Sequence, residues 1–271
     1  MADYGVRLER MGNIAVVTLD RPERQNALNE HMWGCMEGVV DDLKKNLPRV
    51  VIITGAGNKA FCAGWDMNLD NPQALHLLKA IEDHDKGPIM AHISRWRTNT
   101  DRLVMLPVPV IAAVNGLAYG GGAEIASRCD LRVMDPNAVF CFSEVKLGLM
   151  PDHGGAVGLT RLIGPSKAAD LILTARKIGA QEALSLGLVN RISAPGKALD
   201  EAKALAETIA DNGPLAVRHA LKVIRSIQDM SCLAALDLET EEAVKLIARG
   251  ECIHGIAAFL SKQKPVFPEP E

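Results

Sequence analysis

The sequence lacks the patterns that mark several large classes of protein. No apolar run reaches the roughly 18 residues that a membrane span requires. The first ten residues, MADYGVRLER, contain neither an apolar signal segment nor an Arg- and Ser-rich transit helix. The net charge is only −3, which argues against a nucleic-acid binder that works through overall charge and leaves room for a local basic pocket that binds an anionic ligand. We therefore expect a cytoplasmic protein that binds neither membranes nor nucleic acids.

Metal-site and disulfide patterns are missing as well. The chain has no HExxH and no CxxC, and its seven histidines are scattered, so we expect no metal site. Most of the six cysteines lie in apolar runs, which predicts buried free thiols in a reducing compartment. What the chain does have is 271 residues of ordinary globular composition, 48% of them hydrophobic, enough for a real core.

Strand-like and helix-like segments alternate over the first two thirds of the chain. Short β-rich or buried apolar runs occur at 6–10, 13–20, 49–57, 107–116 and 130–145, between amphipathic stretches. Residues 72–105 also have a helical pattern, with an expected break at Gly87-Pro88. From about residue 197 the pattern is helical to the end. This predicts an α/β fold in residues 1–196 and a helical region in 197–271 that packs on its own core or on neighbouring subunits.

The segment NGLAYGGGAEIASRCD (115–130) places a glutamate behind three consecutive glycines. One interpretation is a dinucleotide-binding turn, because Gly116, Gly120 and Gly122 resemble the GxxxGxG of short-chain dehydrogenases. That family also needs a Tyr-x-x-x-Lys, and neither Tyr4 nor Tyr119 has a lysine four residues on. The composition of the chain therefore argues against this interpretation.

Two other interpretations of the segment remain. The glycines can serve close packing, with Glu124 as a solvated residue at a helix start. Alternatively, their backbone N–H groups can face a developing negative charge, with Glu124 about one helical turn further on. A second glycine turn, GNKAFCAGWD (57–66), also follows a buried strand, and a second glutamate, Glu144, follows another. Two donor loops and two carboxylates are the parts needed for chemistry beside a thioester carbonyl.

At this point the chain resembles the enoyl-CoA hydratase/isomerase, or crotonase, family. The resemblance rests on LDRPERQNALN, VVIITGAGNKAFCAGWDM, PVIAAVNGLAYGGGAEIASRCDLRV, FSEVKLGLMPDHGGAVGLTRLIG and LTARKIGAQEALSLGLVNRI, in this order over some 190 residues. It implies a spiral of ββα units in 1–196 that carries the active site. It also implies that the helices of 197–271 form trimers, which commonly pair into hexamers.

The resemblance also implies the site residues. The oxyanion donors fall on the backbone N–H groups of Trp65 and Gly121, and the two hydratase carboxylates on Glu124 and Glu144. The family usually has a small residue at the position of Trp65, so this side chain should reshape the acyl pocket. Coenzyme A is then part of the substrate, and no separate cofactor is expected. The implied positions for binding it are Arg21, Arg24, Ala27, Ala63, Asp66, Met67, Gly120 and Lys262, the last across a subunit boundary.

One segment departs from the hydratase pattern. Hydratases commonly have a small residue after the proline at 151, where this chain has Asp152-His153. Asp152 resembles the catalytic base of some isomerase relatives, but it can also cap a helix that starts near Gly154. A lone loop histidine such as His153 is ordinarily structural or solvated.

The predicted function is that of a lyase: hydration of the 2,3-double bond of an enoyl-CoA, with Glu144 as the main proton-transfer group and Glu124 holding water. The alternatives are double-bond isomerisation, another crotonase-type reaction on an acyl-CoA, and non-catalytic acyl-CoA binding. The sequence does not identify the acyl group, although Trp65, Met67 and residues 76–106 are expected to line its pocket.

Overall fold

The structure is a computed structural model that describes residues 5–68 and 70–270. Its strands are β1 (Val6–Met11), β2 (Ile14–Leu19), β3 (Val50–Gly55), β4 (Ala60–Cys62), β5 (Val110–Val114), β6 (Leu117–Tyr119), β7 (Leu131–Met134), β8 (Val139–Cys141), β9 (Ile178–Gly179) and β10 (Arg191–Ile192). Its α-helices are α1 (Glu30–Lys45), α2 (Pro72–Glu82), α3 (Lys86–Val104), α4 (Gly121–Arg128), α5 (Gly155–Ile163), α6 (Pro165–Thr174), α7 (Ala180–Ser185), α8 (Ala198–Ala210), α9 (Pro214–Ser226), α10 (Cys232–Ala248) and α11 (Glu251–Leu260). Short 3₁₀ turns are η1 (Pro22–Arg24), η2 (Glu144–Leu147) and η3 (Ile227–Asp229).

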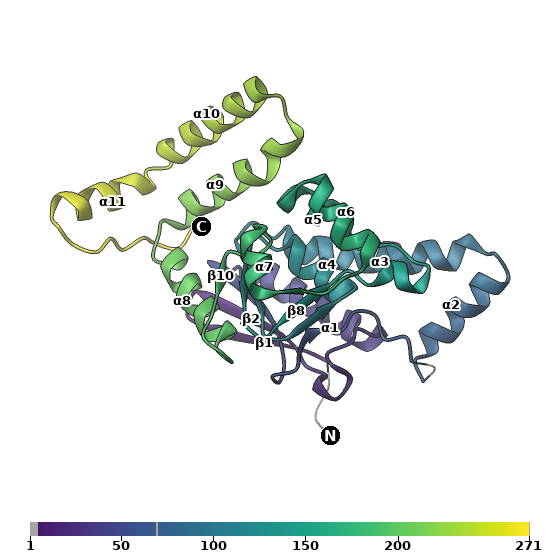
Figure 1. The fold of residues 1–271 in the computed structure, drawn as a ribbon. Coiled ribbons are helices and arrows are strands. Elements are labelled where there is room, and N and C mark those ends of the chain that lie inside the picture. The colour runs from purple at the N-terminus through teal and green to yellow at the C-terminus, as the bar shows by residue number, and fades with distance from the viewer. Residues whose placement is uncertain (1–4, 69, 271) are drawn as a thin grey trace.

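The strands form two sheets that are built by one repeated step. The first sheet has the order β1-β2-β3-β5-β7-β10 and the second the order β4-β6-β8-β9. Each pair β3–β4, β5–β6 and β7–β8 sends its first strand to the first sheet and its second strand to the other, and a helical segment follows. The neighbours within each such row are parallel. The predicted spiral of ββα units is therefore what the chain forms (Figure 1).

Both faces of the first sheet are covered, as parallel strands require. Side chains alternate along each strand, so Val51 and Ile53 of β3 enter the main core, whereas Val50 and Ile52 face the opposite side. That opposite side is closed by α8, whose Ala202, Leu205 and Ala206 pack on the strands. The predicted boundary between 196 and 197 stays a prediction. The helix that follows it packs on the sheet.

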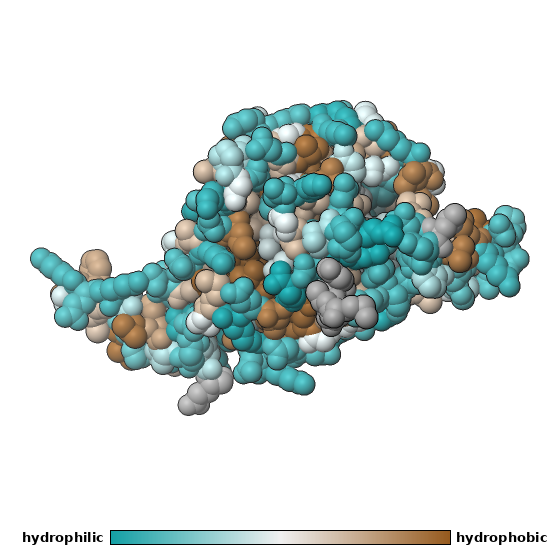
Figure 2. Space-filling view, turned by 90° about the horizontal axis from the view of Figure 1, so that it is seen from below, coloured by the Kyte–Doolittle hydropathy of each residue, from teal (hydrophilic) through white to brown (hydrophobic). Residues whose placement is uncertain are grey.

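The helices after α8 form an arm that extends away from the sheets (Figure 1). Arg225 of α9 anchors the arm through an ion pair with Asp130, with 2.6 Å between Nη2 and Oδ2. Beyond α11 the chain returns to the body, where Arg49 donates to the carbonyl oxygen of Phe267 over 2.9 Å. Figure 2 shows apolar patches on the arm at the left of the view. The arm's exposed apolar side chains include Leu233, Leu236, Val244, Ile247, Ile253, Ile256, Phe259 and Leu260.

Two local expectations were wrong. The break in 72–105 falls at residues 83–85, between α2 and α3, whereas Gly87 and Pro88 lie in the first turn of α3. Proline is tolerated there because the first N–H groups of a helix have no intrahelical partner. The β-rich run 130–145 ends earlier than expected, because β8 ends at Cys141 and Glu144 follows it in the 3₁₀ turn η2. Within the described part of the chain, no helix combines the length and apolar character that crossing a bilayer requires.

Candidate active site

The predicted site residues meet in a cavity of about 300 Å³ between the α2–α3 segment and the start of α4. Trp65, Gly121, Glu124, Glu144 and Asp152 all line it. Its remaining lining is mostly apolar. Met67 and the side chains between 76 and 106 were expected to line the acyl pocket, whereas the residues of 63–64, 120 and 143–153 were not. The remaining lining residues are Ala63, Gly64, Met67, Leu77, Ile81, Ile89, His92, Ile93, Trp96, Gly120, Ser143, Leu147, Leu149, Met150 and His153.

The glycine-rich mouth of α4 lies directly against the loop after β4. A Cβ atom on Gly122 would lie 2.2 Å from the carbonyl oxygen of Cys62, so only glycine allows this approach. Gly120, with φ of 48° and ψ of −124°, turns the chain from β6 into α4 in a conformation that other residues avoid. A Cβ on Gly64 would lie 3.2 Å from the backbone nitrogen of Gly121. The two loops that were predicted to supply backbone donors are therefore in contact.

The backbone at Trp65 leaves its N–H available to the cavity side. Leu28 bridges this loop by donating to the Gly64 carbonyl over 2.7 Å and accepting from Asp66 N over 2.9 Å. Since backbone groups alternate in direction along an extended chain, the N–H of Trp65 points away from Leu28. Gly121 is the first residue of α4, so its N–H has no partner within the helix.

Glu124 is a buried carboxylate, with 1% of the residue exposed, which excludes the solvated interpretation. Its Oε2 accepts hydrogen bonds from the backbone N–H groups of His153 at 2.8 Å and Gly155 at 2.7 Å. Its Oε1 has no hydrogen-bond partner among the described residues. Burial raises the pKa of Glu124 to about 7, which outweighs the opposing effects of the His153 charge and of the Gly155 N–H.

Glu144 approaches the same point from the second sheet's side. A Cβ on Gly120 would lie 3.5 Å from its Oε1, so the carboxylate is beside the glycine mouth. Both carboxylate oxygens are buried and have no hydrogen-bond partner within the described residues. Burial raises the pKa of Glu144 as well. Among the residues that the structure describes, no lysine or arginine forms an ion pair with either glutamate. The negative charges of the two carboxylates would therefore repel each other without compensation, which makes it hard to ionise both.

The loop before α5 differs from what was expected. Asp152 does not cap α5: the N-cap position is Gly154 and no side chain bonds to it. Instead, Asp152 Oδ1 lies 3.2 Å from His153 Nε2. His153 is neither solvated nor remote, since only 4% of it is exposed and its Nδ1 lies 3.8 Å from Glu124 Oε1. The residues Pro151-Asp152-His153 depart from the hydratase pattern in the sequence, but only the fold shows that His153 lies beside Glu124.

All three tryptophans of the chain gather beside this cavity. The ring of Trp96 has its centroid 5.7 Å from that of Trp65, 5.1 Å from that of Trp33 and 5.1 Å from that of His153. His92 packs on Trp96 at 4.3 Å, and burial lowers the pKa of His92 to about 4, with His153 adding to the effect. His92 is therefore neutral near pH 7, and the cavity wall opposite the glutamates is aromatic and uncharged.

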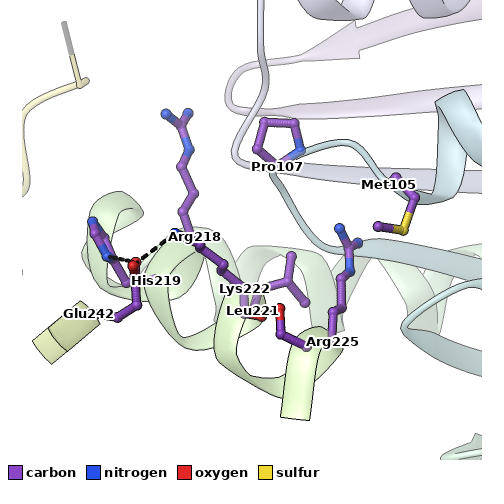
Figure 3. Close-up of a pocket in the computed structure, with 9 residues that line it drawn as sticks. Met105, Pro107, Arg218, His219, Leu221, Lys222, Arg225 and Glu242 are labelled. Atoms are coloured by element: carbon purple, nitrogen blue, oxygen red, sulfur yellow. Dashed lines mark hydrogen bonds and ion pairs between the residues drawn. The ribbon is translucent and has the colours of Figure 1, made fainter. Parts of the chain in front are cut away.

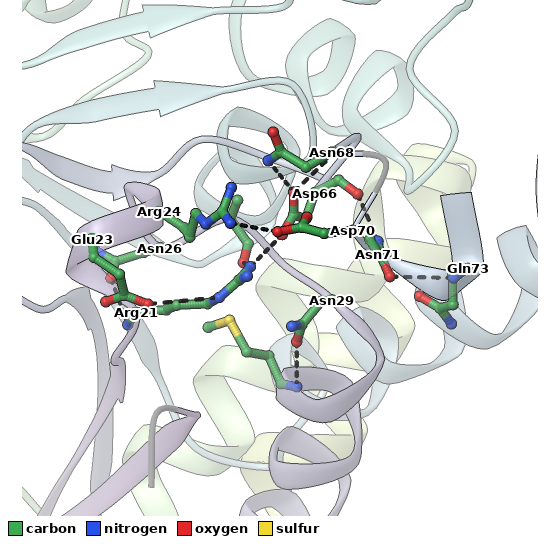
Figure 4. Close-up of polar contacts among 12 residues, drawn as sticks. Arg21, Glu23, Arg24, Asn26, Asn29, Asp66, Asn68, Asp70, Asn71 and Gln73 are labelled. Carbon is green, nitrogen blue, oxygen red and sulfur yellow. Dashed lines mark hydrogen bonds and ion pairs between the residues drawn. The ribbon is translucent and has the colours of Figure 1, made fainter. Parts of the chain in front are cut away.

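Three of the residues assigned to coenzyme A, Arg21, Arg24 and Asp66, lie in one cluster of polar contacts and already have partners (Figure 4). Arg21 donates to Asp66 Oδ2 over 2.5 Å and to the Ala27 carbonyl over 3.2 Å. Arg24, more exposed, pairs with Asp70 over 2.6 Å. Although burial opposes it, hydrogen bonds from Arg21 and Asn68 hold the pKa of Asp66 below its usual value. Arg21 thus has a structural task at Asp66, which lies 45 positions away and was invisible in the sequence.

The other assigned residues divide between the cavity and the arm. Ala63, Met67 and Gly120 line the cavity, and Ala27 is buried behind it. Lys262 follows α11, at the end of the arm that extends away from the body on the side opposite to α2 (Figure 1). A role for Lys262 at this cavity would therefore have to involve another subunit, as the resemblance implied.

One group of side chains in the described part of the chain could hold a cation. Glu124, Asp152 and His153 can each offer a ligand atom within 4.8 Å of the others. The two carboxylates, however, face opposite nitrogens of the imidazole. A metal ion binds one ring nitrogen, so this arrangement suits a chain of proton-bearing groups better than a common ion.

A buried carboxylate in the arm, away from this cavity, has the opposite surroundings. Glu242 of α10 borders a hollow of about 350 Å³ between α9 and residues 105–107 (Figure 3). It pairs with His219 Nδ1 and Lys222 Nζ, each at 2.8 Å, and with Lys245 Nζ at 3.0 Å. Hydrogen bonds from these groups, Lys222 first, lower the pKa of Glu242 to about 2. This carboxylate joins the helices of the arm and has no spare oxygen.

The family of the chain follows from comparison with known proteins. The family model described as enoyl-CoA hydratase/isomerase matches residues 9–270. The chain belongs to the enoyl-CoA hydratase/isomerase family. The short-chain-enoyl-CoA hydratase of Clostridium acetobutylicum is 39% identical, over 96% of this chain and 95% of the relative. The crotonyl-CoA hydratase of Syntrophomonas wolfei is 35% identical, over 98% and 99%.

Solved structures agree with this assignment. The crystal structure of the enoyl-CoA hydratase from Bacillus anthracis matches with a TM-score of 0.89 and 32% identity, covering 97% of this chain and 98% of that one. The predicted crotonase-type α/β fold is thereby confirmed. The enzyme class, an enoyl-CoA hydratase-like hydro-lyase, is confirmed by the relatives.

Proposed function

We propose that this chain adds water across the 2,3-double bond of an enoyl-CoA thioester. The observation that carries the proposal is the pair of buried glutamates, neither paired with a cation among the described residues, beside the N–H groups of Trp65 and Gly121. Because burial raises the pKa of both glutamates and their charges repel, the pair favours a state with one shared proton near neutral pH. The protonated glutamate can then act as an acid and the ionised one as a base. A protein that only bound acyl-CoA would have no use for this pair.

In the proposed reaction, the thioester oxygen accepts hydrogen bonds from Trp65 N and Gly121 N. These donors stabilise the enolate-like charge that develops when water attacks Cβ, and one such donor contributes roughly 3–4 kcal/mol. Glu124 takes the proton of the attacking water, while protonated Glu144 gives a proton to Cα. The proton on Glu124 then passes to Glu144, which restores the starting pair.

Coenzyme A binding is the less specified half of the proposal. We assign the mouth of the cavity to it, with Ala63, Met67 and Gly120 along the wall and Asp66 ordering the loop through Arg21. Arg24 and the Lys262 of a neighbouring subunit are the proposed phosphate partners. The exposed apolar side chains of α10 and α11 support association into trimers or pairs of trimers, since a monomer leaves them in water.

The decisive measurement is the loss of conjugated thioester absorbance when the protein is mixed with crotonyl-CoA. Loss of absorbance with formation of 3-hydroxybutyryl-CoA supports the proposal. Double-bond movement without water uptake in longer enoyl-CoAs would assign the protein to the isomerases instead. Tight coenzyme A binding with no turnover of any enoyl-CoA would leave only a binding role.

A matched pair of variants tests the backbone donor at Trp65. Trp65→Ala removes the ring and keeps the N–H, whereas Trp65→Pro removes both. The bridge to Leu28 uses the Gly64 carbonyl and Asp66 N, so it survives in both variants. We expect kcat in Trp65→Pro to be lower than in Trp65→Ala by roughly 10²-fold, the effect of one lost oxyanion donor. Equal kcat in two folded variants would remove Trp65 N from the mechanism.

A further inference from the structure

His153 is held between two carboxylates whose surroundings differ. On one side, its Nδ1 lies 3.8 Å from Glu124 Oε1, deep in the cavity. On the other, its Nε2 lies 3.2 Å from Asp152 Oδ1, and the Asp152 side chain is 38% exposed. The imidazole therefore connects a buried carboxylate to one that meets solvent.

The atoms between His153 and Glu124 require a proton. His153 Nδ1 and Glu124 Oε1 are both buried and neither has a hydrogen-bond partner among the described residues. If Nε2–H donates to Asp152, a neutral imidazole would present its lone pair at Nδ1 to the lone pairs of Oε1. Two facing acceptors without a donor are costly in a water-poor site. A proton on either atom removes this conflict. On Nδ1 it makes the group an imidazolium between two carboxylates, which is the arrangement that leaves Glu124 ionised.

The surroundings fix the orientation of the ring. The backbone of His153 is bonded at both ends, because its N–H donates to Glu124 Oε2 and its carbonyl accepts from Arg128 Nη1 at 2.8 Å. Trp96 packs against the ring, tilted by 40°. On the remaining side, a Cβ on Gly121 would lie 3.0 Å from Nδ1, so the ring sits against the mouth of α4. The ring cannot turn without displacing these neighbours.

We propose that His153, backed by Asp152, is a positioning residue that keeps Glu124 ionised and its Oε1 directed into the cavity before water attacks. The proposal rests on the hydratase function for its catalytic consequence. In the working cycle the imidazolium keeps both protons: Nδ1–H donates to Glu124 and Nε2–H to Asp152. Only Glu124 gains the proton of water and loses it to Glu144, so the protons balance. Apo contacts of 3.8 Å commonly shorten when substrate closes such a site.

The other charged or titratable groups that face His153 are few in the described part of the chain. Glu144 lies beside the same glycine mouth, and His92 of α3 faces the ring across Trp96. Arg128 of α4 reaches the carbonyl oxygen of His153, and Asp101 of α3 pairs with that arginine. The positive charge of His153 opposes the rise in the pKa of Glu124, in agreement with the geometry.

The test is the pH dependence of Glu124 ionisation in His153→Gln. Glutamine can donate one hydrogen bond but carries no charge, so the ionisation midpoint of Glu124 should rise by about one pH unit, a tenfold change in proton affinity. NMR titration of carboxyl-labelled glutamate reads this midpoint directly, with Glu124→Gln identifying the signal. In crotonyl-CoA hydration, the acid limb of kcat should move by the same amount, while KM stays constant and activity returns at high pH.

Controls separate this role from a structural one. His92→Gln makes the same chemical change in the same cavity without touching a carboxylate, so its Glu124 midpoint should equal that of the wild type. Asp152→Asn should raise the midpoint when His153 is present, because the imidazolium loses its partner. In His153→Gln the same change should not raise the midpoint, because only the direct repulsion between Asp152 and Glu124 is then removed. His153→Phe provides a second variant if His153→Gln fails to fold.

An unchanged Glu124 midpoint in a folded His153 variant would overturn the inference, even if kcat fell. Failure of the wild type to hydrate crotonyl-CoA would instead overturn the proposed function. The NMR midpoint decides the role of His153 in either case, so the two failures are distinguishable.

Discussion

Glu124 in the cavity and Glu242 in the arm are both hidden from solvent, but they differ in the charge around them and in how strongly burial acts on their pKa. Glu242 is surrounded by His219, Lys222 and Lys245, and its pKa falls to about 2. Glu124 is buried to the same degree, and burial raises its pKa to about 7. Burial alone therefore does not decide what a carboxylate does. Glu242, with both oxygens bonded to basic side chains, joins two helices, whereas Glu124 has one oxygen without a hydrogen-bond partner among the described residues and suits the proton transfer that we propose.

The largest expected effect separates the two sites by activity. Glu144→Gln keeps the size of the side chain but cannot transfer a proton, so kcat for crotonyl-CoA should fall by at least ~10²-fold. Glu242→Gln changes the same atoms in the arm and should leave kcat unchanged when both are assayed as folded protein. The comparison fails if Glu144→Gln retains half of the wild-type kcat.

A second prediction concerns the pH dependence of stability at Glu124. Its folded pKa of about 7 exceeds the ordinary glutamate value of 4.5, so the contribution to stability is fully present below pH 4.5 and is lost as pH rises through 7. Glu124→Gln removes this dependence. We compare the free energy of unfolding of the variant with that of the wild type at two pH values. The variant's value minus the wild-type value should be about 3 kcal/mol larger at pH 9 than at pH 4. Urea titrations at the two pH values measure the change, and parallel pH profiles would contradict it.

The same measurement on Glu242 should give the opposite slope. Its folded pKa of about 2 lies below 4.5, so its stabilisation is present above pH 4.5 and is lost as pH falls toward 2. Glu242→Gln should therefore lower the melting temperature at pH 7 by several degrees, with a smaller deficit near pH 3. A variant equally destabilised at both pH values would show that packing, not charge, fastens the arm.

The smallest expected effect is at Asp152. Because its carboxylate faces His153 and is partly exposed, Asp152→Asn should reduce hydration by less than ~10-fold, below the range for loss of a general base. The assay is the same as for Glu144→Gln. If Asp152→Asn were the more damaging of the two, Asp152 would be the base and the isomerase alternative would return.

Much of the fold and the principal members of the site were predictable, and the reasons are local. The apolar run 107–116 marks a buried strand by its composition, and residues 30–45 mark a helix by the helical spacing of their apolar residues. The start of that helix, α1, is also marked locally, because Asn29 accepts a hydrogen bond from Met32 N. The predicted site residues Trp65, Gly121, Glu124 and Glu144 do share one cavity. Their chemical roles stay predictions.

What the sequence could not supply depends on contacts between distant segments. The short strands β4 and β6 pair across more than fifty residues, and too few residues in each signal a strand. Arg21 meets Asp66, and His153 meets Glu124, only because the spiral stacks its turns. Asp152 was given two interpretations from its local context, and its real partner is its neighbour's ring.

The two backbone hydrogen bonds at Glu124 Oε2 have an evolutionary consequence. They attach the loop before α5 to α4, so Glu124 stabilises part of the fold in addition to its proposed role in the reaction. A descendant that abandoned catalysis would still be selected to keep Glu124, since losing it strands two buried N–H groups. Glu144 has no such bonds and would drift freely. Among relatives of this chain, a glutamate at the position of Glu144 should therefore indicate catalytic activity better than a glutamate at the position of Glu124, which inactive relatives can also retain.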